Sequence, residues 1–207
     1  MELKHQAEAD RKLRAAIAVA DAHLPDHLPP LFYLTDPART PDPVATAQRL
    51  PQGCGIIYRH FGAAERERTA RTLMQITNRN GLVLLIAADP DLAQAVRAHG
   101  VHWPEARLSE AHHWHGKFAL NTASAHSARA IQRAAQADMD AALVSPVFAS
   151  NSPSAGPPIG AAQFRNMVRE ADLPIYGLGG INSDTAGEIA PYAGLAAIEG
   201  VEAVFET

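Results

Sequence analysis

The stretch Gly177-Leu-Gly-Gly180 decides the fold, because it is a glycine-rich turn that comes late in a chain of 207 residues. It follows the short apolar segment Pro174-Ile-Tyr-Gly-Leu178, which reads as a strand. In a doubly wound dinucleotide-binding fold, such a turn lies after the first strand. In a (β/α)8 barrel, phosphate sites follow strands seven and eight. The late position of these glycines therefore favours the barrel.

Short apolar segments alternate with helical segments along the whole chain. This alternation predicts a parallel sheet with right-handed crossovers. The segments expected to be strands are Leu31–Thr35, Gly55–Arg59, Leu82–Ala88, Val101–Trp103, Phe118–Ser124, Ala141–Val144, Pro174–Leu178 and Leu195–Ile198. Eight such units favour an α/β fold that closes into a single (β/α)8 TIM barrel, with an open doubly wound sheet as the alternative.

Residues 3–24 predict an additional N-terminal helix. Apolar residues recur at helical spacing from Leu13 to Leu24, and Pro25 ends the pattern. Later in the chain, Asp89 followed by proline predicts a helix start, and Gly100 is expected just past the end of that helix. We expect one domain over residues 1–207, with a helical extension over 1–28 and the barrel over 29–207.

Composition excludes several classes of protein. The 18 Lys+Arg and 22 Asp+Glu residues give a formal net charge of −4, which argues against a general nucleic-acid binder. Cys54 is the only cysteine, so a disulfide scaffold and a cysteine zinc site are excluded. The polar segment Met1–Lys12 does not resemble a secretory signal, and no apolar run approaches the roughly 20 residues that cross a bilayer. We expect a cytoplasmic protein without nucleic-acid or membrane partners, and leave a homo-oligomer open.

Several short motifs follow one another in a recognisable order along the chain. They are Tyr33-Leu-Thr-Asp-Pro37, Arg59 at the end of the second strand, Gly100-Val-His102, Ser124-Ala-His-Ser127, Ser145-Pro-Val-Phe148 and Gly179-Gly-Ile181. Together they resemble the thiamine phosphate synthase family, which includes the TenI-like thiazole tautomerase branch. The resemblance extends over roughly residues 31–203. It implies a TIM barrel and an enzyme of thiamin metabolism that binds a small phosphorylated thiazole.

The chain departs from the synthase pattern where that family binds magnesium. The Asn-Asp pair of the synthase aligns with Ala87-Ala88, and its second magnesium Asp aligns with Arg107. The family's Thr-x-Thr-Lys run reads Ser150-Asn-Ser-Pro153 here, so its lysine is absent. Magnesium requires hard oxygen ligands such as carboxylates. We therefore expect no metal site and no cofactor, and magnesium only if the chain is a synthase with unusual ligands.

The tautomerase branch requires an acid/base group and a phosphate site, and the resemblance gives the acid/base role to His126. With Ser124 as N-cap, His126 would lie in the first turn of a helix, where the dipole favours neutral imidazole. Arg59 is the second expected catalytic residue, as an anchor for phosphate or carboxylate. The expected substrate-binding residues are Ser124, Ser145, Ser150, Ser152, Gly179, Gly180 and Gly200. Glu199 replaces a phosphate-contacting serine of the family and counts against a phosphate nearby.

Two other interpretations remain open at this stage. The cluster His112, His113 and His115 is interpreted as a solvated surface patch rather than a metal site. For the whole chain, we favour a metal-independent, TenI-like thiazole tautomerase. The alternatives are a thiamine phosphate synthase, which joins a pyrimidine diphosphate to a thiazole phosphate, and a non-catalytic binding protein.

Overall fold

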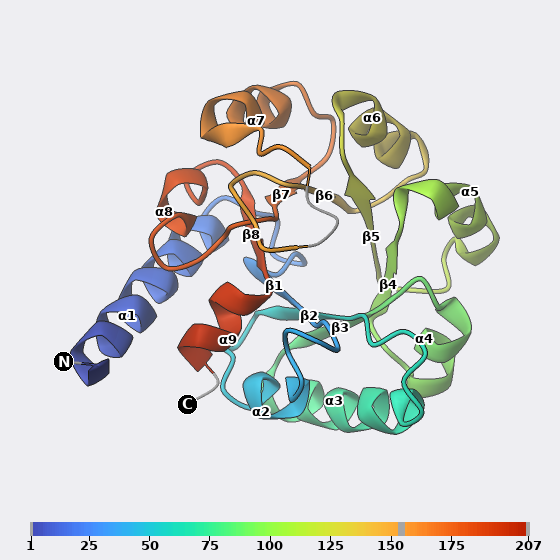
Figure 1. Cartoon of the computed structure of the whole chain (residues 1–207). Coiled ribbons are helices and arrows are strands. Elements are labelled where there is room, and N and C mark those ends of the chain that lie inside the picture. The colour runs from blue at the N-terminus through green and yellow to red at the C-terminus, as the bar shows by residue number, and fades with distance from the viewer. Residues whose placement is uncertain (1, 153–155, 206–207) are drawn as a thin grey trace.

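Eight parallel strands form a closed barrel in the order of the sequence, with β8 paired to β1 (Figure 1). The computed structural model describes residues 2–152 and 156–205. The strands are β1 Leu31–Leu34, β2 Gly55–Tyr58, β3 Val83–Ala87, β4 Gly100–Trp103, β5 Leu120–Ala125, β6 Ala141–Val144, β7 Ile175–Gly177 and β8 Gly194–Ala197. The predicted (β/α)8 barrel is confirmed, and the open sheet is excluded.

Helices surround this barrel (Figure 1). The α-helices are α1 Glu2–Asp21, α2 Pro43–Ala47, α3 Arg66–Asn80, α4 Pro90–Val96, α5 Leu108–Ala111, α6 Ala128–Gln136, α7 Gly160–Arg169, α8 Ala186–Ile189 and α9 Glu199–Phe205. Two 3-10 helices, η1 Glu105–Arg107 and η2 His112–Trp114, flank α5. Within the described ranges, no helix is long and apolar enough to cross a membrane.

The strands are apolar on both faces because the core has two layers. In β1, Leu31 and Tyr33 belong to the layer between the barrel and the helices, whereas Phe32 and Leu34 belong to the layer inside the barrel. Successive side chains of a strand point to opposite faces, and both faces of a barrel strand are covered. This explains why the strand segments of the sequence are continuous apolar runs rather than alternating patterns.

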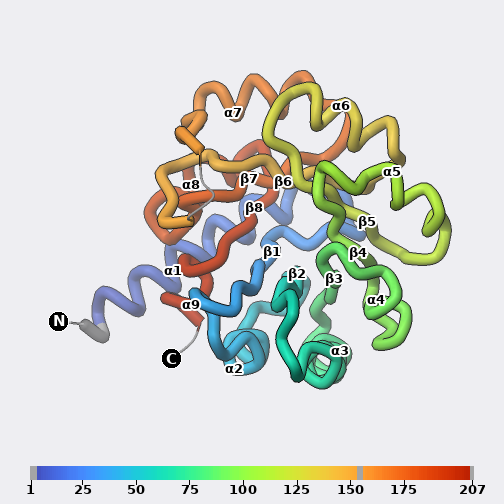
Figure 2. The backbone as a smooth tube through the Cα atoms, turned by 45° about the vertical axis from the view of Figure 1, so that its right-hand side comes forward, coloured from blue at the N-terminus to red at the C-terminus, as the bar shows by residue number. Residues whose placement is uncertain are grey.

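The predicted N-terminal helix is present as α1. Figures 1 and 2 both show it outside the barrel, beside α8 and α9. It also contacts β8. Its buried side chains include Leu13, Ala16, Ile17 and Ala20, which are the apolar positions expected from the sequence. The helix therefore covers the barrel next to the last two strand–helix units.

The expected role of Gly100 is wrong. Helix α4 begins as predicted, with the Asp89 side chain accepting from Leu92 N at 3.0 Å, but it ends earlier, at Val96, with Arg97 as its C-cap. Arg97 has the left-handed conformation, with φ 57°. Gly100 opens β4 instead, and a Cβ there would lie 1.6 Å from the carbonyl oxygen of Leu120. This glycine allows two neighbouring strands to approach each other and does not cap a helix.

Candidate functional site

The main functional candidate is a cavity of about 670 Å³ at the carboxyl ends of the strands. Both expected catalytic residues, Arg59 and His126, line it. Of the expected substrate-binding residues, Ser124, Ser145, Ser150, Ser152 and Gly179 also line it. Active sites of TIM barrels lie at this end of the barrel. The structure thus places the catalytic candidates in one cavity, and their roles stay predictions.

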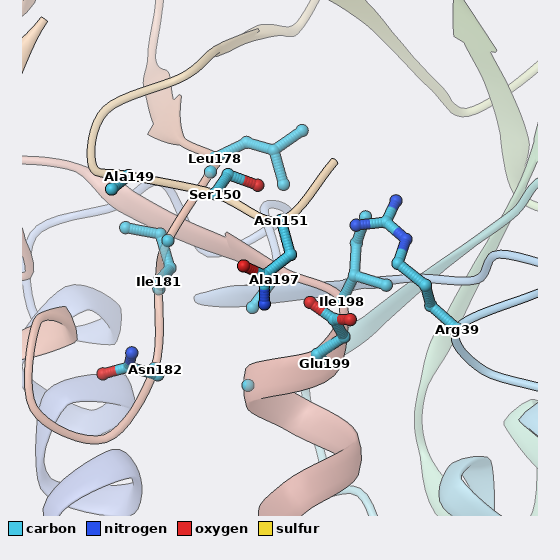
Figure 3. Close-up of a pocket in the computed structure, with 13 residues that line it drawn as sticks. Arg39, Ala149, Ser150, Asn151, Leu178, Ile181, Asn182, Ala197, Ile198 and Glu199 are labelled. Carbon is cyan, nitrogen blue, oxygen red and sulfur yellow. The ribbon is translucent and has the colours of Figure 1, made fainter. Parts of the chain in front are cut away.

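A smaller cavity of about 260 Å³ adjoins the first one. The two cavities share five lining residues, namely Arg39, Ser150, Leu178, Gly179 and Ile198. The remaining expected binding residues, Gly180 and Gly200, line only the smaller cavity, which also contains Asn151, Asn182 and Glu199 (Figure 3). All the substrate-binding residues expected from the sequence therefore line one or both of two connected cavities.

His126 Nδ1 lies 3.1 Å from the carbonyl oxygen of Ser145 and 3.4 Å from the hydroxyl oxygen of the same residue. A carbonyl oxygen only accepts hydrogen bonds, so the shorter of these two contacts favours the tautomer with its hydrogen on Nδ1. In the neutral ring, Nε2 is then unprotonated, and no described residue is its hydrogen-bond partner. The side chain is exposed. His126 can therefore accept a proton at Nε2 from a molecule in the cavity.

The expectation that Ser124 caps the following helix is wrong. Strand β5 continues to Ala125, and α6 begins after Ser127, whose hydroxyl accepts from Ala130 N at 3.2 Å. His126 consequently precedes the helix rather than lying in its first turn. Its backbone N–H donates to the Glu105 carboxylate at 3.3 Å. The contact with Ser145 orients its ring, and the residue lies outside the first turn on which the expected effect of a helix dipole depends.

Two arginines that line the larger cavity, Arg39 and Arg59, share the carboxylate of Asp36. Asp36 Oδ2 lies 3.0 Å from Arg39 Nη2 and 3.4 Å from Arg59 Nη2. Burial by itself raises the pKa of the Asp36 carboxyl, but the hydrogen bond from Arg39 and further bonds leave it below its usual value. Two guanidinium groups and one carboxylate carry a net charge of +1. This part of the larger cavity suits a carboxylate or phosphate group.

His102 is a buried residue of the larger cavity whose role was not predicted from the sequence. Its Nδ1 lies 2.9 Å from Thr122 Oγ1, and its Nε2 lies 2.8 Å from Ser124 Oγ. Burial and, secondarily, the charge of Arg59 lower the pKa of His102 to about 3. A neutral imidazole thus fixes the hydroxyl of Ser124 at the cavity surface.

We expect His102 to make the protein less stable in mild acid. The folded-state pKa of about 3 is below the ordinary value of 6.5, so the unfolded chain binds the proton first as the pH falls. The free energy of unfolding should decrease below pH 6.5, by up to about 1.4 kcal/mol for each pH unit. Urea unfolding of the wild type and His102→Gln at pH 6.5 and 5.0 measures this. Equal losses in both proteins would contradict the assignment.

The residues at the ends of β3 and β4 do not fit a magnesium ion. Ala87 and Ala88 have no side-chain ligands, and the carbonyl oxygen of Ala88 accepts from Arg107 Nη1 at 2.6 Å. The nearby Asp89 carboxylate is paired with Arg66. A guanidinium therefore lies where the family pattern places a magnesium carboxylate.

The histidine cluster of the sequence does not form a metal site in the structure either. His112, His113 and His115 are exposed residues in and just after η2. Across residues 2–152 and 156–205, no group of three or more His, Cys, Asp or Glu side chains could hold a metal ion. Neither this cluster nor the cavities contain the carboxylate set that magnesium requires.

We expect magnesium to leave the thermal stability unchanged. A ligand that binds only the folded state raises the melting temperature, and the cationic Arg107 disfavours a divalent cation. Melting curves with millimolar MgCl2, with EDTA, and with NaCl at matched ionic strength measure this. A rise in melting temperature specific to MgCl2 would contradict the expectation and support a synthase.

Comparisons with known proteins agree with this architecture. Residues 35–204 match the family model described as thiamine monophosphate synthase. The chain is 30% identical to thiamine-phosphate synthase of Alcanivorax borkumensis, over 84% of each protein. It is 31% identical to thiamine-phosphate synthase of Chloroflexus aurantiacus, over 72% of this chain and 71% of that protein.

A solved structure shares the fold. Thiamine phosphate pyrophosphorylase from Pyrococcus furiosus superposes with a TM-score of 0.69 over 87% of this chain and 93% of that one, at 23% identity. The family model covers most of the barrel, from the residue after β1 to the last helix. The chain therefore belongs to the thiamine monophosphate synthase family of thiamine biosynthesis.

Proposed function

We propose that this chain is a metal-independent enzyme that moves a proton on a thiazole ligand, like the TenI-like branch of its family. The observation that carries the proposal is the contact of His126 Nδ1 with the carbonyl oxygen of Ser145, which leaves Nε2 without a partner among the described residues, in the cavity that Arg59 also lines. A base near pH 7 and an anchor for an anionic group are the two elements that such a reaction needs. The proposal uses no metal, in agreement with the residues at Ala87, Ala88 and Arg107.

The proton transfer requires only groups of this chain. Arg59 holds the carboxylate of the ligand by a charge-assisted hydrogen bond. His126 Nε2 takes a proton from one atom of the ligand, and the resulting imidazolium keeps its Nδ1–H directed at the carbonyl of Ser145. The imidazolium then returns a proton to a second atom of the ligand. The base is thereby regenerated, and the ligand is isomerised without oxidation or loss of atoms.

The side chain of the ligand extends into the smaller cavity. Gly179 and Gly180 have φ values of 93° and 66°, a backbone conformation that glycine adopts readily. No acceptor among the described residues receives their amide hydrogens, so these N–H groups can bind an oxygen of the ligand. The sequence predicts that the phosphate group of the ligand binds at these two glycines. Glu199 lines the same cavity and opposes a dianion.

Turnover and binding assays distinguish the three functional classes. The protein is incubated with a thiazole carboxylate tautomer in EDTA, and separately with a pyrimidine diphosphate, a thiazole phosphate and magnesium. Conversion of the tautomer in EDTA supports the proposal. Formation of thiamine phosphate in the second mixture would identify a synthase. Thiazole binding by calorimetry without either product would identify a binding protein.

A further inference from the structure

The smaller cavity contains a carboxylate that a phosphate site would not have. Glu199 is the first residue of α9, two residues after the last residue of β8, and it lines this cavity. Figure 3 places the Glu199 carboxylate on the same side of the pocket as Arg39, with Asn182 on the opposite side. Among the described residues, no cation lies within 4 Å of this carboxylate to form an ion pair. Its charge is therefore available to a ligand.

Among the described residues that line this cavity, Arg39 alone has a guanidinium, and that group is already engaged. Arg39 donates to Asp36 at 3.0 Å, and Asp36 is shared with Arg59. The two arginines, Asp36 and Glu199 together carry no net charge. A phosphate dianion would meet one shared guanidinium and the carboxylate of Glu199, an exposed residue whose charge has the same sign, and like charges repel.

The other lining groups suit an uncharged polar ligand. Ser150, Asn151, Asn182 and the backbone of Gly179–Gly180 offer hydroxyl, amide and N–H groups. A ligand hydroxyl can donate to Glu199 and accept from a backbone N–H at the same time. The lining of the smaller cavity thus supplies both an acceptor and a donor for the hydroxyl group of a ligand.

The position of Glu199 is also fixed by the helix that carries it. Glu202, one turn further along α9, is buried. Its carboxylate accepts from the hydroxyls of Tyr33 and of Thr46, the latter at 3.1 Å. These buried hydrogen bonds tie α9 to β1 and α2. The backbone of Glu199 is thereby held at the cavity, and moving it away would break them.

From this arrangement we infer that Glu199 determines specificity: the smaller cavity selects a ligand that ends in a neutral hydroxyl over one that ends in a phosphate. The inference rests on the proposed function in taking the ligand to be a thiazole. It changes the expectation from the sequence, in which this end carried a phosphate. The corresponding ligand is a thiazole with a free hydroxyethyl group.

The test measures affinities by calorimetry at pH 8, where the phosphate monoester is a dianion. The probes are a thiazole carboxylate with a free hydroxyethyl group, its phosphate monoester and inorganic phosphate. The proteins are the wild type, Glu199→Gln and Glu199→Ser. We expect the wild type to bind the alcohol about 10-fold or more tightly than the phosphate ester, and Glu199→Ser to reverse this order. Glu188→Gln, which removes an exposed carboxylate of α8 outside the cavity, is the matched control and should leave the ratio unchanged.

The outcomes separate this inference from the proposed function, because binding requires no turnover. Equal or tighter binding of the phosphate ester by the wild type, with the same ratio in both Glu199 variants, would overturn the inference. If neither thiazole binds, the proposed function fails. The affinity for inorganic phosphate still tests the role of Glu199. A gain of phosphate binding in Glu199→Ser then supports its role, and the absence of a gain refutes it.

Discussion

His126→Asn is expected to lower tautomerase turnover by about 10²–10⁴-fold, the usual contribution of a general acid–base group. The amide of asparagine does not accept a proton near neutral pH. The amide N–H can still donate to the carbonyl of Ser145, so the cavity keeps its shape. The affinity for the ligand should therefore stay within a few-fold of the wild type, since Arg59 and the smaller cavity are unchanged.

Steady-state kinetics and calorimetry on the same preparations measure the two effects. His115→Asn removes an exposed imidazole that lines neither of the two cavities and serves as the control. Its turnover should equal that of the wild type. If His126→Asn converts the substrate at the parent rate, His126 is not the base and the proposed mechanism is refuted.

Gly100→Ala is expected to destabilise the barrel by more than about 3 kcal/mol, or to prevent folding. The added Cβ would lie 1.6 Å from the carbonyl oxygen of Leu120, a backbone atom of the neighbouring strand. Overpacking of a core costs about 1–3 kcal/mol when side chains can adjust. Here β4 and β5 themselves would have to separate, which disrupts the pairing of Gly100 with Leu120.

Urea unfolding followed by circular dichroism measures this loss. Gly187→Ala is the matched control, because a Cβ on Gly187 meets no atom within 4 Å. Gly187 lies in α8, where alanine is favoured over glycine by about 0.5–1 kcal/mol. The control should therefore be neutral or slightly stabilised. A Gly100→Ala protein as stable as the wild type would show that the strands are not so closely packed.

Strands were predictable from this sequence to a greater degree than helix ends. Apolar runs such as Leu82–Ala88 are set by burial on two faces, which composition reveals directly. The position of a helix end depends on which of several similar residues caps the helix. Ser124 and Ser127 can both cap a helix, and only the length of β5 decides between them. Arg97 in the left-handed conformation has no signal in the sequence.

Residues of the candidate site could be predicted where the residue type and its position at the end of a strand are enough to identify them. Arg59 and His126 follow strand ends, so their convergence on one cavity follows from the barrel. His102 was missed because its role depends on strand register. The pairing of His102 with Thr122 places the imidazole beside two hydroxyls of β5, those of Thr122 and Ser124. Alternation of Thr122 and Ser124 on one face was the only signal available.

The measurement that tests the central claim most directly is conversion of a thiazole carboxylate tautomer in D2O with EDTA, followed by NMR. Metal-independent proton transfer through the exposed His126 predicts conversion in EDTA, with solvent deuterium at the atom that receives the proton. Conversion by His126→Asn should be slower by the factor given above. No conversion in EDTA, together with thiamine phosphate formed from a pyrimidine diphosphate once magnesium is added, would contradict the account.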